Sequence, residues 1–213
     1  MANRFADIAF TPGVRAVQEA RGSRANYARM EQGETVNDRL GTEEAQFIAA
    51  RDSFYMACVS ETGWPYVQHR GGPVGFIKVL DTGTIGFADF RGNRQYVSVG
   101  NLLHDDRVSL ILVDYAQRAR LKLLGRARIV APEQHELLAQ LATPGYRAKA
   151  ERGWLISIEA FDWNCPQHIT PRFTTAQLEA ATAPLEERIA ELERELARQR
   201  VQASQAATSS QVL

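Results

Sequence analysis

Residues 107–130, with the sequence RVSLILVDYAQRARLKLLGRARIV, indicate two strands joined by a short turn. The runs 107–115 and 119–130 are rich in Val, Ile and Leu, and polar side chains recur between the apolar ones. This composition and alternation are typical of strands that place one face on a hydrophobic core. The segment therefore predicts a β-hairpin.

Further short runs of the same character lie on both sides of this hairpin. Four more strands are expected, at 54–60, 74–80, 84–88 and 154–163, and residues 66–70 resume an extended course after a break at Gly63-Trp64-Pro65. Only short helices are expected between them, near 94–104 and from Pro132. A doubly wound parallel sheet would need a long helix between strands. We therefore expect a mainly β fold, a six-stranded antiparallel split β-barrel with short helices.

Residues 1–41 form a polar, Arg- and Gly-rich N-terminal arm with weak helical runs near 12–21 and 23–31. Its few apolar residues would dock on the main body or on a partner subunit: Phe5, Ile8, Phe10, Val14 and Val17. The barrel domain is expected at 42–173. It begins with a helix at Thr42, whose first turn carries the acidic residues that the helix dipole favours.

Residues 174–200 predict an amphipathic helix, because apolar side chains recur at helical spacing: Leu178, Leu185, Ile189, Leu192 and Leu196. Pro184 fits as an early residue of a helix that starts near 183. Two interpretations stay open. The helix packs on its own barrel, or it pairs with its symmetry mate as a short coiled coil. The polar tail 201–213 is expected to be disordered.

Composition excludes several classes of protein. The 25 Lys and Arg residues balance 25 Asp and Glu, so net charge gives no reason to expect nucleic acid or an anionic membrane as a partner. Two cysteines without a CxxC motif exclude a paired zinc site and a disulfide scaffold. No apolar run approaches the length of a membrane helix, and the start lacks the pattern of a signal peptide. We expect a cytoplasmic protein.

The segment PYVQHRGGP (65–73) is the first candidate for chemistry. Strand alternation places Tyr66, Gln68 and Arg70 on one face and Val67 and His69 on the other. The glycines at 71 and 72 would let a flat group approach the backbone. A single His or Arg in a strand is more often a surface residue, so the hypothesis rests on the whole segment.

The segment ADFRGNRQ (88–95) lies between a strand and a helix. Converging amides and the Arg94 guanidinium would form a cradle for an oxyanion or phosphate, although a plain turn is the favoured interpretation of this segment taken alone. Arg120 would face a pocket or cover a barrel end. In WNCPQHITPR (163–172), a single Cys and a single His make a poor metal site, and Cys165 is a candidate redox thiol or a buried small residue.

The order and spacing of these motifs resemble the pyridoxamine 5'-phosphate oxidase-like family of FMN-binding split barrels, over roughly residues 45–173. The matching segments are PYVQHRGGP, GFADFRGNRQYVSVGNLLHDDRVSLIL, RARLKLLGRARIV and DWNCPQHITPR. The resemblance implies FMN as cofactor and a homodimer with two FMN sites at its interface.

The resemblance also implies which residues contact FMN. Gln68, His69, Arg70 and Gly71 would line the flavin ring and ribityl chain, and Ala88 and Asp89 would lie beside the cofactor. The phosphate would be held by Asn93, Arg94 and Gln95, where Gln95 replaces a lysine of the family. Further contacts are expected from Arg120 across the dimer interface and from Trp163, His168 and Arg172 near the C-terminal end. The residues with which the oxidases hold their substrate phosphate are missing, so the vitamin B6 reaction is not implied.

The sequence thus favours an FMN-dependent oxidoreductase acting on an unidentified small molecule. One alternative is a non-catalytic flavin or haem carrier on the same barrel. Another is an interaction protein in which the terminal helix is the working part.

Overall fold

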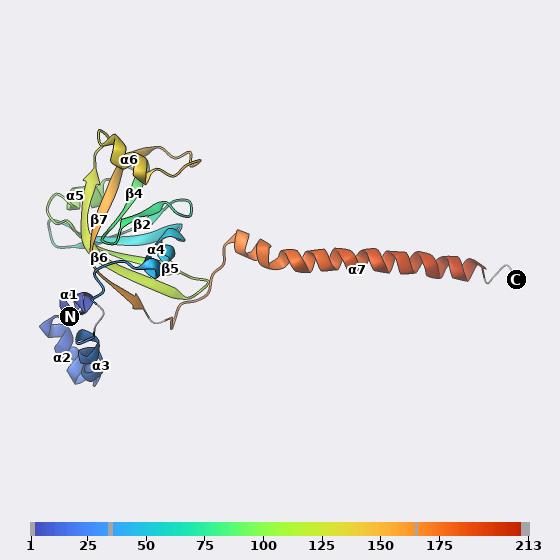
Figure 1. Cartoon of the computed structure of the whole chain (residues 1–213), viewed down its shortest axis with the longest axis horizontal. Helices are drawn as coiled ribbons and strands as arrows, with labels where there is room; N and C mark the ends of the chain where they lie inside the picture. Colours follow the sequence, from blue (N-terminus) through green and yellow to red (C-terminus); the bar gives the residue numbers. More distant parts are fainter. Residues whose placement is uncertain (1–2, 34–35, 165, 210–213) are drawn as a thin grey trace. The chain divides into compact units, whose positions relative to one another are not determined.

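The computed structural model describes residues 3–33, 36–164 and 166–209 of the chain. It divides into two compact units, Met1–Ile169 and Thr170–Leu213. In its described residues the first unit contains six short helices and one sheet of seven strands, and the second contains a single long helix (Figure 1). The first unit holds every cavity discussed below.

All strand pairs of the sheet are antiparallel, in the order β2-β1-β5-β6-β7-β4-β3. The strands are β1 (Ser53–Val59), β2 (Pro65–Gly71), β3 (Ile77–Asp81), β4 (Thr84–Phe90), β5 (Arg107–Asp114), β6 (Ala119–Val130) and β7 (Ala150–Asn164). The hairpin predicted from 107–130 is confirmed as β5 and β6, which pair from Arg107↔Arg126 to Asp114↔Ala119. It lies at the middle of the sheet, and the fold is the expected split barrel.

The strand count differs from the expected six, because residues 65–71 form a strand of their own. β2 pairs with β1 along its whole length, from Ser53↔Gly71 to Val59↔Pro65. The break at 63–65 is therefore a hairpin turn, in which the Ser60 N–H donates to the Trp64 carbonyl at 2.9 Å. Among the described strands, β2 and β3 do not pair with each other, so the sheet stays open between them.

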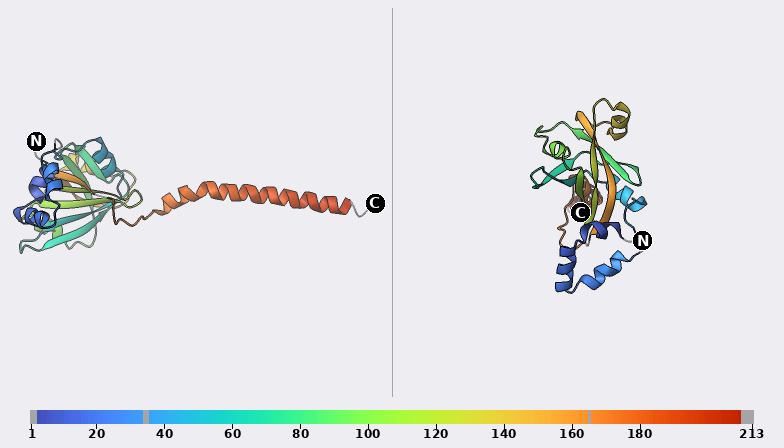
Figure 2. Two further views of the ribbon diagram at one scale, coloured as in Figure 1. Left: turned by 90° about the horizontal axis from the view of Figure 1, so that it is seen from below. Right: turned by 90° about the vertical axis from the view of Figure 1, so that its left-hand side faces the viewer.

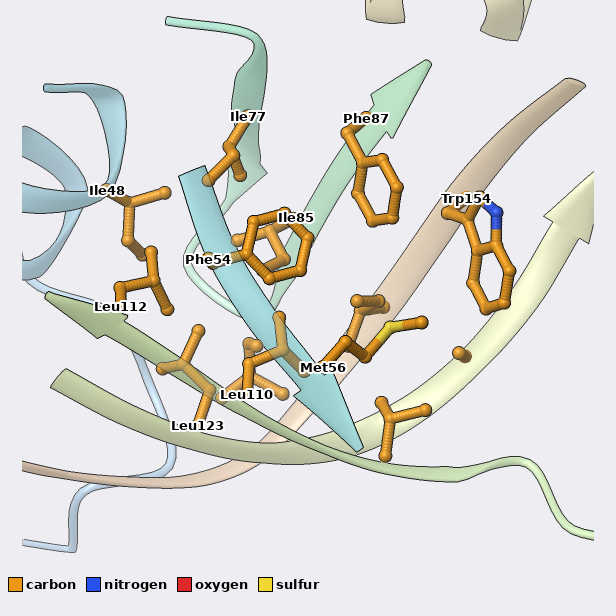
Figure 3. Close-up of a cluster of buried hydrophobic side chains, with 14 of the residues drawn as sticks. Ile48, Phe54, Met56, Ile77, Ile85, Phe87, Leu110, Leu112, Leu123 and Trp154 are labelled. Atoms are coloured by element: carbon orange, nitrogen blue, oxygen red, sulfur yellow. The ribbon is translucent and has the colours of Figure 1, made fainter. Parts of the chain in front are cut away.

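The core fills the concave side of this sheet. Inward positions alternate along each strand, as Phe54, Met56 and Cys58 do in β1. Aromatic rings from neighbouring strands stack there, and the rings of Phe87 and Trp154 are nearly parallel with centroids 5.9 Å apart. Figure 3 shows these side chains converging from β1, β3, β4, β5, β6 and β7, with Ile48 added from a helix. This core supports the strands that line the cavities described below.

Three helices border the barrel. They are α4 (Thr42–Ala49), α5 (Val97–Asn101) and α6 (His135–Leu141). The predicted start of α4 at Thr42 is confirmed, and Glu44 fixes it by accepting the Gly41 N–H at 2.9 Å. The helix expected from Pro132 begins three residues later, at His135.

The N-terminal arm folds as three helices, α1 (Arg4–Ala9), α2 (Pro12–Ala20) and α3 (Arg24–Glu31). The sequence predicted the last two and missed α1, whose N-cap Asn3 accepts the Ala6 N–H at 3.0 Å. Figure 2 shows the arm gathered at one end of the barrel. Phe5 docks on the barrel as expected and is buried, whereas Val17 is 61% exposed.

The second unit is formed by α7, which spans Thr175–Ser209. It starts earlier than the predicted residue 183, so Pro184 lies in its interior rather than in its first turn. It also continues to Ser209, so residues 201–209 are helical rather than disordered. The remaining tail lies outside the described residues.

Candidate functional site at the β2–β4 cavity

A cavity of about 220 Å³ lies where β2, the end of β4 and the loop before α5 meet. Its lining brings together segments far apart in the sequence, and includes Tyr66, Gln68, Arg70, Asp89, Asn93, Arg94, Gln95, Tyr96, Ser98 and Glu151. A second cavity of about 170 Å³ shares Gln68, Arg70 and Asp89 with the first, and adds His69, Gly71 and Ala88 to the lining. Nine of the thirteen residues singled out by the sequence therefore lie around two adjoining cavities.

Strand alternation in β2 has the predicted consequence. Tyr66, Gln68 and Arg70 line the larger cavity, while Val67 is exposed on the opposite face. The Ser98 hydroxyl in α5 lies 2.9 Å from Gln68 Oε1 and donates to it. Because this oxygen is already engaged, the amide NH₂ group of Gln68 is the part available to a ligand.

Arg70 is held by a buried ion pair. Its Nη1 lies 2.7 Å from Asp89 Oδ1, and both side chains are only 13% exposed. Burial lowers the pKa of Arg70, while Asp89 acts in the opposite direction; a guanidinium remains charged under these conditions. The group also lies over the Trp154 ring, 5.1 Å from its centroid. Arg70 is thus a fixed positive charge at the floor of the site.

A second arginine, Arg152 of β7, extends this pair into a network. Its Nε lies 3.4 Å from Asp89 Oδ2, and its Nη2 lies 3.0 Å from Glu151 Oε2. The guanidinium also lies 4.6 Å from the centroid of the Tyr96 ring. Two arginines and two carboxylates therefore tie β2, β4 and β7 to the loop before α5.

The loop before α5 has an unusual backbone. Arg94 and Tyr96 adopt positive φ angles of 60° and 56°, a region that costs free energy for residues other than glycine. Side chains compensate: Asn93 Oδ1 accepts the Gln95 N–H at 3.2 Å, and Arg94 Nε donates to Tyr96 Oη at 3.0 Å. The Tyr96 hydroxyl also lies 3.4 Å from Glu151 Oε2. The loop is thus held with Arg94 at the cavity, and the hydrogen bond to Tyr96 raises the pKa of Arg94.

The two glycines at the end of β2, Gly71 and the Gly72 that follows the strand, pack closely against the chain itself. A Cβ at Gly72 would lie 2.6 Å from Cγ of Phe76, a core residue. A Cβ at Gly71 would lie 3.1 Å from His69 Cε1. Internal packing thus accounts for glycine at these positions, and the expectation that the pair admits a flat ligand stays a prediction.

Four sequence-predicted residues are not among the described residues that line either cavity. Arg120 is the second residue of β6, where it pairs with Val113 of β5 and Asn164 of β7. Trp163 packs against Phe47, and its indole Nε1 donates to Glu44 Oε1 at 2.7 Å. His168 is exposed, Arg172 belongs to the second unit, and Cys165 lies outside the described residues.

Sequence reasoning missed Arg152, Glu151, Tyr96 and Ser98. The last strand was expected to begin at residue 154, so Glu151 and Arg152 were left in a loop. The structure shows why they matter: β7 extends back to Ala150, and its antiparallel pairing with β4 places Arg152 opposite Asp89. Tyr96 and Ser98 carried no signal, since single hydroxyl residues beside a loop are common.

The arrangement is suited to holding an anionic, hydrogen-bonding ligand. Arg70 and Arg94 supply positive charge to the lining, and Gln68 and Asn93 supply amide groups. In the part of the chain that the structure describes, no group of three or more His, Cys, Asp or Glu side chains could hold a metal ion. Nor does any described helix have the length and apolar character needed to cross a bilayer.

Comparison with known proteins gives a family and several solved folds. Solved structures similar to the chain include a protein of the pyridoxinephosphate oxidase family from Clostridium acetobutylicum (14% identity, 63% of this chain and 93% of that one, TM-score 0.43). They also include a FAD-binding protein from Mesorhizobium loti (18%, 58% and 94%, 0.42) and an FMN-binding protein from Syntrophomonas wolfei (13%, 70% and 97%, 0.39). No curated protein matches the chain.

The family model described as pyridoxamine 5'-phosphate oxidase matches residues 40–160, which is more than half of the chain and includes β1–β6, most of β7 and both cavities. The chain therefore belongs to the pyridoxamine 5'-phosphate oxidase family.

Proposed function

We propose that the protein is an FMN-binding flavoprotein and acts as an oxidoreductase on a small molecule. One observation carries this proposal. Gln68 and Arg70 of β2 share a cavity with Asn93, Arg94 and Gln95, which are about twenty-five residues away in the sequence. These are the two segments that the family resemblance assigns to the flavin and to its phosphate.

The residues present fit the chemistry of FMN. A buried Nε of Arg70 has no hydrogen-bond partner within the protein, so a donor remains to be satisfied at the wall of the cavity. Arg94 is the cation available to a phosphate, and Gln68 offers an amide NH₂ to a flavin carbonyl or ribityl hydroxyl.

Bound FMN would supply hydride or electron transfer, and the protein would supply binding and electrostatics. Arg70 places a fixed positive charge near the ligand, and such a charge stabilises an anionic form of it. The ion pair with Asp89 holds the guanidinium in one orientation, so little reorganisation is needed when charge develops.

A homodimer is part of this proposal. The larger cavity is smaller than the 300–1,000 Å³ usual for ligand pockets. Arg120 and Trp163, which the resemblance assigns to the same cofactor, lie outside the lining within one chain. A two-fold partner that contributes its Arg120 would enlarge and complete the pocket.

The test begins with the purified protein. We expect a yellow preparation whose cofactor has the absorbance spectrum and mass of FMN, and whose flavin is bleached by NADH or NADPH under anaerobic conditions. Flavin that copurifies but resists both donors would favour the carrier. A colourless protein that binds no added FMN would refute the proposal.

A further inference from the structure

The apolar stripe of α7 has the width of a coiled-coil seam. When Leu185 is placed at heptad position d, Leu178 and Leu192 also fall at d, and Ile189 and Leu196 fall at a. These five side chains are between 47% and 64% exposed. A solvated stripe of this size on a helix needs a partner.

The residues beside the stripe indicate what kind of partner fits. Between Leu185 and Arg200 every e and g position is charged: Glu186, Arg188, Glu193, Glu195 and Arg200. A helix that covers a globular core usually has apolar residues at e or g as well, which widens its stripe beyond 100°. A seam limited to a and d and bordered by charge on both sides fits another helix of the same kind.

We propose that α7 pairs with α7 of a second copy as a parallel, in-register, two-stranded coiled coil. In such a pair each g residue faces the e residue five positions further along the other chain. Arg188 then faces Glu193 of the partner subunit, and Glu195 faces Arg200 of the partner subunit. Both contacts join opposite charges, and the two-fold axis repeats each of them.

The antiparallel alternative brings like charges together. Two antiparallel registers give four apolar layers each. The first stacks Leu185 on Ile189 of the partner subunit, and it places Glu186 near Glu186 of the partner subunit and Arg188 near Arg188 of the partner subunit. The second stacks Leu185 on Leu196 of the partner subunit, and it places Arg188 near Glu195 of the partner subunit but Glu186 near Glu193 of the partner subunit. Each antiparallel register therefore opposes like charges, which the parallel form avoids. Since e and g charges set orientation in coiled coils, the sequence selects the parallel form.

Two further features agree with a two-stranded coil. Ile189 at a with Leu at the flanking d positions is the combination that favours two strands. Pro184 falls at position c, on the side away from the seam, so its ring does not obstruct the second helix. The inference uses no residue of the first unit and is independent of the proposed function.

Cysteine cross-linking in the full chain tests the orientation directly. In a Cys165→Ser background, where Cys58 is buried, Leu192→Cys should form a covalent dimer under mild oxidation because two d residues face each other. The matched control, Arg194→Cys at the outer position f, should remain monomeric on a denaturing gel. In the two antiparallel registers residue 192 faces residue 182 or residue 189, so a double variant, Thr182→Cys/Leu192→Cys or Ile189→Cys/Leu192→Cys, would cross-link in place of the single variant.

Charge exchange provides a second test that does not depend on a disulfide. Arg188→Glu should lower the melting temperature of the α7 helix signal, and the added substitution Glu193→Arg should restore it. Failure of Leu192→Cys to cross-link above the control, or cross-linking only of a double variant, would overturn the parallel coil. So would a melting temperature that Glu193→Arg fails to restore. Flavin absorbance, read in the same samples, reports separately on the proposed function.

Discussion

Arg94 is exposed and lines the cavity, so it is the residue on which we expect binding of the FMN phosphate to depend most. Arg94→Ala should weaken FMN binding about tenfold or more, the effect of losing a charge-assisted hydrogen bond. Arg91→Ala is the matched control, because Arg91 pairs with Glu151 at 3.6 Å but is absent from the described lining. Titration of the apoprotein with FMN measures both. Equal affinities for the two variants would show that the phosphate lies elsewhere.

Asp89 neutralises two arginines at once, and its loss should be felt in stability. Asp89→Asn leaves Arg70 and Arg152 without their shared carboxylate in a site that is 13–18% exposed, which should cost about 3 kcal/mol of unfolding free energy. Asp106→Asn is the comparison, since its pair with Arg126 is about half exposed and its loss should leave the free energy of unfolding nearly unchanged. Urea unfolding measures both, and similar losses would contradict the network.

At the scale of the elements, the pairing of β6 with β7 depends on one position where the two backbones approach each other closely. The register between them shifts at Leu124/Gly125, and a Cβ at Gly125 would lie 2.4 Å from the Ser157 carbonyl oxygen. Because that neighbour is backbone and cannot rotate away, Gly125→Ala should destabilise the barrel by about 2 kcal/mol.

Gly100 provides the opposite case in α5. A Cβ added at Gly100 would meet nothing within 4 Å. Gly100→Ala should therefore raise the free energy of unfolding by up to about 1 kcal/mol, because alanine reduces the conformational entropy of the unfolded chain. Thermal unfolding of the two variants should therefore move in opposite directions. A stable Gly125→Ala barrel would show that the bulge can relax.

The elements also show how far the sequence could be interpreted. Strand periodicity placed β6 at its observed bounds, Ala119–Val130, because alternation on a half-buried strand is a local signal. The extension of β7 back to Ala150 could not be found this way, since it is stabilised by pairing with β4. The same holds for the site: the sequence named Arg70 and Asp89, but that they pair depends on the fold. Which cofactor contacts the proposed partner subunit would supply likewise cannot be predicted from local sequence.

At the scale of the whole molecule, we expect the first compact unit to bind FMN without help from the second. A chain ending at Arg172 retains every described residue that lines the cavities, so it should bind FMN with nearly unchanged affinity. Flavin titration of the shortened and full chains makes the comparison. Loss of FMN from a shortened chain that is still folded would show that α7 closes the site.

The shortened chain also isolates association of the barrel from association of α7. If the partner subunit completes the pocket, FMN binds the dimer and not the monomer, and saturation stabilises the dimer by mass action. Sedimentation should show monomer without FMN converting to dimer as FMN is added at low protein concentration. A monomer that binds FMN stoichiometrically would contradict the shared pocket.

The stacking of Trp154 on Phe87, described above as core packing, has an optical consequence. Trp154 is fully buried and its indole N–H has no hydrogen-bond partner, so its fluorescence should be emitted at short wavelength, while Trp64, 73% exposed, emits at longer wavelength. The Arg70 side chain, which lines the cavity, lies 5.1 Å from the centroid of the Trp154 ring. A flavin in that cavity would accept excitation energy from this indole first, so the blue part of the emission would report occupancy without any added label.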